Sequence, residues 1–219
     1  MTSFQTSDIH FTRHANGADV PASRQVAAFV ELWRQLANEQ TADAHAPARV
    51  PAKQAFTMQR LKPFLPNYFL AEWTGDDLRN RLVGSALDEQ MGRRLTGESF
   101  LASYKGDQRD YFMAFWRQLV ETPCGVITRR TIHLDGETTL RLNGASLPLA
   151  DASGTVRFLC GVGDIAREFS HERAPQNGRH VFIDHIQYLD LGFGLPSSVP
   201  DPAVFNAATD RALAAASSY

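Results

Sequence analysis

Two histidines and a serine have residue types and spacing that could do chemistry. His10 and His14 stand four residues apart, like two zinc ligands on one helix, but no glutamate follows His10 and no further ligand is placed. Ser146 lacks the glycine two residues later that a nucleophile elbow requires. The sequence therefore predicts solvated histidines, no metal site, no catalytic residues and no enzymatic activity.

The glycine-rich segment Gly161–Ala166 follows an apolar run and formally resembles a dinucleotide-binding fingerprint. Asp184 even lies about twenty residues further on, where such a site places its ribose-binding acid. The helix that should follow, residues 164–173, has few apolar residues, and little chain remains to build the other strands. Glycines in a sheet strand that another backbone segment approaches are the favoured interpretation. A nucleotide-binding enzyme that uses this segment is the alternative.

Arginines and aromatic residues supply the candidates for a ligand-binding site. Arg129 and Arg141 fall on neighbouring strand-like segments and Arg81 on a hairpin, so inward-pointing side chains could orient an acidic or amide-bearing ligand. The alternative is that they lie on a solvated face and pair with acids. The candidate ligand-binding residues are Arg81, Phe112, Trp116, Arg129, Arg141 and Asn143. No residue pattern identifies a cofactor, so the cofactor is left unknown.

The composition is that of a globular protein with one main core. Of the 219 residues, 43% are hydrophobic and 21% are charged. Lys and Arg number 22 against 24 Asp and Glu, and this net charge of -2 gives no electrostatic footprint for nucleic acid. No targeting segment or membrane-spanning apolar run is present in the sequence. With only Cys124 and Cys160, in separate segments, a cytoplasmic protein with reduced thiols is expected.

The segments that must position these residues follow an α+β order. Apolar residues recur at helical spacing after Ser23 and again over residues 107–121, which predicts two amphipathic helices. Residues 68–73 and 78–83 predict a hairpin, and residues 124–134, 138–149 and 155–165 predict three more strands. Short helical pieces are expected at 52–61, 85–91, 97–104 and, weakly, 202–216. The helical segments 85–91, 97–104 and 107–121 all fall between the second and third strands, so the sheet must be antiparallel.

Two motifs carry a resemblance to a known family. Residues 79–85 read Arg-Asn-Arg-Leu-Val-Gly-Ser, and residues 92–100 read Gly-Arg-Arg-Leu-Thr-Gly-Glu-Ser-Phe. Over residues 54–166 the chain resembles a bacterial PAS-domain family of alphaproteobacteria once catalogued as a domain of unknown function, and it departs from that pattern at Asn80. The resemblance implies a five-stranded antiparallel sheet with helices on one face. The expected division is a flexible arm (1–22), an N-terminal helical extension (23–62), a PAS-like domain (63–167) and a C-terminal extension (168–219).

The resemblance and the two extensions together predict a signalling protein. In many PAS proteins a helix before the first strand pairs with a second copy, so Phe29, Val30 and Trp33 are candidates for a homodimer interface. The alternative is that this stripe packs on its own sheet. Residues 180–196 are unusually apolar and either pack on the domain or bind a partner. We predict a stand-alone PAS sensor for signal transduction that acts through protein–protein interaction with a signalling partner, biased by a small ligand, with a ligand-free scaffold as a further alternative.

Overall fold

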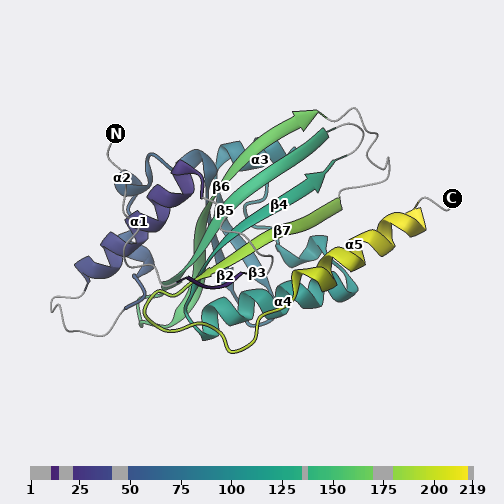
Figure 1. The fold of residues 1–219 in the computed structure, drawn as a ribbon. Helices are drawn as coiled ribbons and strands as arrows, with labels where there is room; N and C mark the ends of the chain where they lie inside the picture. The colour runs from purple at the N-terminus through teal and green to yellow at the C-terminus, as the bar shows by residue number, and fades with distance from the viewer. Residues whose placement is uncertain (1–10, 15–21, 41–48, 135–137, 170–179, 217–219) are drawn as a thin grey trace, which may run out of the picture.

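One antiparallel sheet organises the chain (Figure 1). The computed structural model describes residues 11–14, 22–40, 49–134, 138–169 and 180–216. The strands are β1 (Phe11–His14), β2 (Tyr68–Trp73), β3 (Leu78–Val83), β4 (Gly125–His133), β5 (Thr138–Ala150), β6 (Val156–Phe169) and β7 (His180–Leu189). In the described ranges they form a seven-stranded sheet in the order β1-β7-β4-β5-β6-β2-β3, with antiparallel neighbours throughout.

The predicted count of five strands is too low. β7 pairs with β4 along its whole length and the short β1 pairs with β7, so the described sheet has six long strands and one short one. The outer side of β4 would otherwise present unpaired backbone groups, and the apolar residues of β7 are buried there. The segment that begins at residue 180 therefore packs on the domain, which is one of the two alternatives that its sequence left open.

The helices lie close to the predicted positions. They are α1 (Arg24–Glu39), α2 (Met58–Leu61), α3 (Ser85–Met91), α4 (Gly106–Glu121) and α5 (Pro202–Ala216), with short 3-10 turns η1 (Lys53–Ala55), η2 (Leu65–Asn67) and η3 (Leu101–Ser103). The helix expected over residues 52–61 is thus split into η1 and α2. No helix in the described part of the chain is long and apolar enough to cross a lipid bilayer.

Helix α1 packs on one side of the sheet, which we call the α1 face. Ser23 caps the helix, because its hydroxyl oxygen accepts a hydrogen bond from the Val26 backbone N–H at 3.3 Å. The apolar stripe of the helix then enters a core with sheet residues such as Leu147 and Phe158. Trp33 is 2% exposed, and its indole N–H donates to the backbone oxygen of Pro148 at 2.8 Å. The N-terminal stripe therefore folds on its own sheet.

Helices α4 and α5 cover the opposite side, which we call the α4 face (Figure 1). Side chains alternate between the two faces along each strand, so Ile127 joins the α1 face while its neighbour Val126 joins the α4 face. Aromatic rings pack against one another beneath these helices, and Phe112 contacts Phe115, Trp116 and other aromatic residues. Aromatic residues are therefore concentrated where α4 and α5 meet the sheet.

The turn between β5 and β6 is built around Asp151 and Gly154. An oxygen of Asp151 accepts hydrogen bonds from the Ser153 hydroxyl at 2.6 Å and from the backbone N–H groups of Ser153 and Thr155 at 2.8 and 3.1 Å. These hydrogen bonds, the Ser153 hydroxyl first, hold the pKa of Asp151 below its ordinary value. Gly154 completes the turn at φ +85°, which only glycine adopts without strain. The long β5–β6 hairpin is thus fixed at its tip.

Candidate functional site

A small cavity lies between α4 and the sheet. It is lined by Tyr111, Phe112, Phe115 and Trp116 from α4, Thr128 and Arg130 from β4, and Ile183 and Ile186 from β7. The volume open to water is about 10 Å³, which is room for one water molecule. Ile183 and Ile186 share one side of β7, despite being three residues apart, because the register shifts opposite Arg129 and Arg130.

Two aromatic side chains of this cavity have polar groups without a hydrogen-bond partner. The Tyr111 hydroxyl and the Trp116 indole nitrogen are buried and unpartnered, and their residues are only 5% and 4% exposed. The nearby Tyr188 hydroxyl is in the same condition at 2% exposure. Burial raises the pKa of Tyr111 and of Tyr188 well above the ordinary value, so both hydroxyls keep their protons. Buried polar groups usually have partners, so this cluster is unusual for a structural core.

Arg130 adds a positive charge to the same cavity. Its Nε atom is buried without a hydrogen-bond partner, and none of the residues that line the cavity is acidic. Burial lowers the pKa of Arg130, while the Tyr104 and Tyr111 hydroxyls act in the opposite direction. Arg130 as a whole is half-buried, and holding the buried part of its guanidinium without a counter-charge costs stability. The cavity therefore has an excess of donors and positive charge over acceptors.

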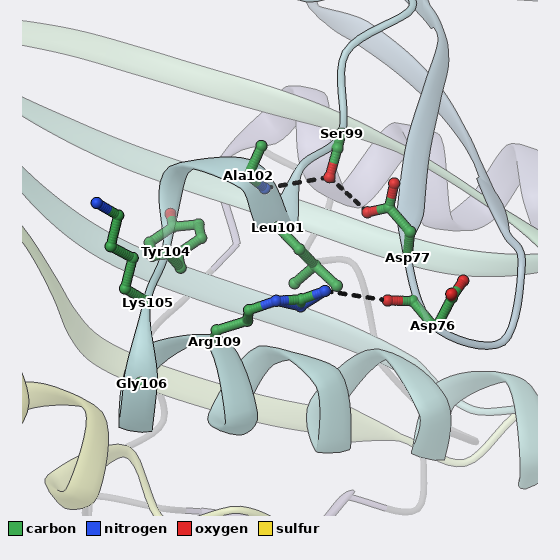
Figure 2. Close-up of a pocket in the computed structure, with 9 residues that line it drawn as sticks. All are labelled: Asp76, Asp77, Ser99, Leu101, Ala102, Tyr104, Lys105, Gly106 and Arg109. Carbon is green, nitrogen blue, oxygen red and sulfur yellow. Dashed lines mark hydrogen bonds between the residues drawn. The ribbon is translucent and has the colours of Figure 1, made fainter.

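A larger, open groove lies outside this core, between the β2–β3 turn and the start of α4 (Figure 2). Its volume is about 620 Å³. Its lining is Asp76, Asp77, Ser99, Leu101, Ala102, Tyr104, Lys105, Gly106 and Arg109. Acidic and basic side chains are mixed along it, and Ser99 has no histidine in this lining to act as its base.

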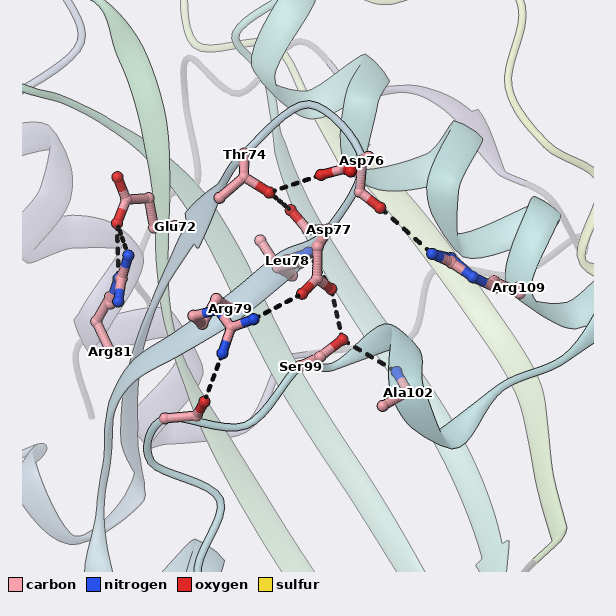
Figure 3. A network of polar contacts seen from close by, with 11 residues as sticks. Glu72, Thr74, Asp76, Asp77, Leu78, Arg79, Arg81, Ser99, Ala102 and Arg109 are labelled. Carbon is pink, nitrogen blue, oxygen red and sulfur yellow. Dashed lines mark hydrogen bonds and ion pairs between the residues drawn. The ribbon is translucent and has the colours of Figure 1, made fainter.

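The polar groups of the groove are largely used by a network that holds the hairpin in place (Figure 3). One carboxylate oxygen of Asp77 accepts hydrogen bonds from the Ser99 hydroxyl at 2.5 Å and from the Leu78 backbone N–H at 2.8 Å. The Ser99 oxygen accepts in turn from the backbone N–H of Ala102 at 3.1 Å. Arg109 of α4 donates to the backbone oxygen of Asp76 at 3.5 Å. These contacts tie the β2–β3 turn to η3 and α4, so the groove is mainly structural.

Comparison with known proteins identifies the family of this arrangement. The family model described as PAS domain matches residues 21–163. The chain belongs to the PAS domain family. No curated protein and no solved structure matches it. PAS domains are sensory and regulatory modules, and that is the class of function to which family membership assigns the chain.

Of the six predicted ligand-binding residues, Phe112 and Trp116 line the interior cavity of this PAS domain. Arg81 and Arg141 lie elsewhere, because Arg81 pairs with Glu72 at 2.6 Å and Arg141 pairs with Glu168 at 3.2 Å. Both arginines are exposed to solvent. The expected inward direction is therefore incorrect for these two, and the alternative of surface arginines paired with acids is what the structure has.

Arg129 and Asn143 also fail to join the cavity. They pair across β4 and β5 and alternate with the cavity residues Thr128 and Arg130, so they lie on the other face of the sheet. The cavity arginine is Arg130, which the sequence reasoning missed by one position. Strand parity puts Arg130 on the same side as Val126 and Ile132, but only the register of the sheet shows that this side enters the α4-face core.

Gly161–Ala166, the segment of the nucleotide-binding alternative, lies within the continuous strand β6. A dinucleotide fingerprint needs a turn into a helix, and β6 runs on to Phe169 without one. A Cβ on Gly161 would lie 1.9 Å from the backbone oxygen of Ala145 and 2.5 Å from the Phe69 ring. The favoured interpretation, glycine where another backbone segment approaches, is therefore confirmed at Gly161.

The remaining candidates are placed as follows. Phe29, Val30 and Trp33, predicted for a dimer interface, are 0%, 6% and 2% exposed within their own chain. A homodimer through α1 stays a prediction, and it would have to use the exposed residues on the other side of that helix. His10, part of the dismissed zinc pair, lies outside the described residues. Asn80, the departure from the family pattern, is buried and its backbone N–H donates to the Glu98 oxygen at 2.9 Å.

Proposed function

We propose that this chain is a PAS sensory and regulatory module that acts through protein–protein contacts, and that a small molecule in the interior cavity biases it. The observation that carries the proposal is the direct contact between the aromatic wall of the cavity and helix α5. The Phe205 ring of α5 lies 5.0 Å from Phe112 and 5.4 Å from Tyr111, measured between centroids. Because packed aromatic rings interdigitate closely, a ring that moves in the cavity must move its neighbour.

Polar contacts on α5 would transmit such a movement to the sheet. The Asn206 amide both accepts from the Ile183 backbone N–H and donates to the Ile183 oxygen, at 2.9 and 3.0 Å. The Thr209 hydroxyl donates to the Val181 oxygen and accepts from the Gln108 amide of α4. Helix α5 therefore connects β7 and α4. Its outward side, which exposes 52% of Val204, is the proposed contact surface for a signalling partner.

The same proposal includes a non-catalytic role, a cytoplasmic location and a homodimer. A non-catalytic role is supported by the use of Asp77 and Ser99 in structural hydrogen bonds within the groove. A cytoplasmic setting is supported by Cys124 and Cys160, which are buried free thiols. A homodimer is supported only by family precedent, and light scattering after size-exclusion chromatography measures it directly.

Hydrogen–deuterium exchange tests the coupling between cavity and α5. We expect Phe112→Leu, which removes one of the rings that contact Phe205, to speed exchange of the α5 amides by about tenfold, because the free energy of local opening falls when packing is lost. Amides of α1 should be unchanged. The matched control is Phe29→Leu on the α1 face, which should speed exchange in α1 and leave α5 as it was.

Two outcomes contradict the proposal. Equal acceleration of α1 and α5 by Phe112→Leu would mean that the domain opens as one unit without a directed path. Unchanged α5 exchange, together with a native mass spectrum that contains neither a bound molecule nor a second copy, would favour the ligand-free scaffold. The nucleotide-binding alternative predicts instead a dinucleotide-dependent rise in melting temperature.

A further inference from the structure

The chemistry of the interior cavity restricts what can complete it. The Arg130 guanidinium and the Trp116 indole N–H can only donate hydrogen bonds. The atoms that remain unpartnered there, Arg130 Nε and Trp116 Nε1, therefore need an acceptor, and the Tyr111 hydroxyl can donate to the same acceptor. Because none of the lining residues carries a carboxylate, the missing acceptor is most simply an anion from outside the chain.

The number of charges and the nature of the walls narrow the class of anion. One guanidinium matches one negative charge, whereas a phosphate group at neutral pH would leave charge uncompensated in the core. Apart from the Thr128 hydroxyl, the rest of the lining is apolar and consists of Phe112, Phe115, Ile183 and Ile186. A single acid group joined to a short apolar body fits both features.

We propose that the cavity between α4 and the sheet binds a small monocarboxylate, with its carboxyl group on Arg130 and its apolar part among Phe112, Phe115 and Ile186. This inference rests on the proposed sensory function and specifies its ligand. The cavity has room for only one water molecule, so entry of the acid has to displace an aromatic ring of α4. The ring nearest to α5, Phe112, then passes the displacement to Phe205.

Thermal unfolding of the full chain with a series of acids tests the proposal. The probes are sodium formate, acetate, propionate and benzoate, each compared with sodium chloride at equal ionic strength. At a concentration about 100 times its Kd, a bound acid should raise the melting temperature by about 5–10 °C. Arg130→Gln should abolish this shift. Arg129→Gln, the neighbouring arginine on the other face, is the matched control and should keep it.

Two further variants keep the test decisive if Arg130→Gln folds poorly. Arg130→Met should raise the melting temperature in chloride alone, because it removes a half-buried charge that has no acidic residue beside it in the cavity, and it should show no shift with any acid. Trp116→Phe removes only the indole N–H donor of the cavity wall and should weaken binding by about 3–10-fold, as measured by isothermal titration calorimetry.

Three results would overturn the monocarboxylate site. Equal shifts in Arg129→Gln and Arg130→Gln would place the binding elsewhere. No shift with any acid in the wild type would mean that the Nε–H of Arg130 donates to a buried water molecule and not to an acid. A melting temperature lowered by Arg130→Met would assign Arg130 a structural contact. In each case the exchange coupling between Phe112 and α5 is measured without any acid, so the sensory proposal stands or fails separately.

Discussion

Trp33 and Trp116 are both almost fully buried, one on each face of the sheet, and their indole N–H groups differ. Trp33 donates to the Pro148 oxygen at 2.8 Å, whereas the nitrogen of Trp116 has no partner. The same contrast holds for charge. Glu72, a buried residue of β2, pairs with both Arg81 and Arg157, while the guanidinium of Arg130 has no acid beside it in the cavity.

The two faces of the sheet differ in whether their buried polar groups are paired within the chain. On the α1 face, the buried tryptophan and glutamate have partners from the chain itself, so this side is complete as it folds. On the α4 face the aromatic core keeps donors and a positive charge without acceptors, which costs stability. Proteins retain such a cost mainly where function uses it. The first face therefore fixes the fold, and the second is the place to look for a signal.

The largest expected effect compares the two tryptophans. Trp33→Phe should lower the free energy of unfolding by about 2–4 kcal/mol, because it shrinks a packed side chain and leaves the Pro148 oxygen unpaired. Trp116→Phe should cost about 1 kcal/mol or less, since the loss of packing is offset by removal of an unpartnered donor. Urea denaturation of both variants gives the two values. Equal losses would mean that Trp116 has a partner of its own, such as a tightly held water.

An intermediate effect on stability is expected from the ion pairs of Glu72. Glu72→Gln should lower the free energy of unfolding by about 1–2 kcal/mol, because Glu72 is 9% exposed and two arginines lose their counter-charge. The value is kept modest because Arg81 and Arg157 are half exposed and partly screened. Glu98→Gln is the control. Its pair with Arg93 is exposed on both sides, so the loss should stay below about 0.5 kcal/mol. Equal losses in the two variants would mean that the buried Glu72 stabilises the fold no more than the exposed Glu98.

The smallest effect is a pH dependence on the side of the sheet opposite the cavity. The pKa of His133 is lowered by burial and then by Arg141 and His180. An unfolded chain with an ordinary histidine binds a proton below roughly pH 6.5, and the folded chain resists it, so stability falls with acidification in that range. His133→Gln should therefore show a shallower loss of stability between neutral and mildly acidic pH in thermal scans. If stability falls with pH as steeply in His133→Gln as in the wild type, other titratable groups control this pH dependence.

The order of elements could be predicted because local patterns are strong here. The hairpin at 68–73 and 78–83, the short helix at 85–91 and the amphipathic helix after Ser23 coincide with β2, β3, α3 and α1. Each has its own signal, such as a cap, a turn or a period of apolar residues. Residues 180–189 have a strand-like pattern, but their place in the sheet was not predicted. Their partner β4 lies some 50 residues earlier in the chain, and long-range pairing leaves no local mark in the sequence.

The site was harder to predict than the fold. In Val126–His133 both alternating sets contain apolar, hydroxyl and charged residues, so the sequence does not tell which arginine faces α4. Only the register with β5 and β7 decides between Arg129 and Arg130. Phe112 and Trp116 were found because an amphipathic helix has one apolar side and must turn it to the sheet.

The way α5 holds β7 also affects how copies of the chain meet. Asn206 binds Ile183 through both ends of its amide, as the backbone of an adjacent strand would, and Thr209 occupies the Val181 oxygen. Short β1 pairs near the other end of β7, at Gln187 and Leu189. The open side of β7 is thus blocked by side chains that mimic a strand. Detachment of α5 would uncover a template for edge-to-edge aggregation, so this helix also protects the protein from polymerising.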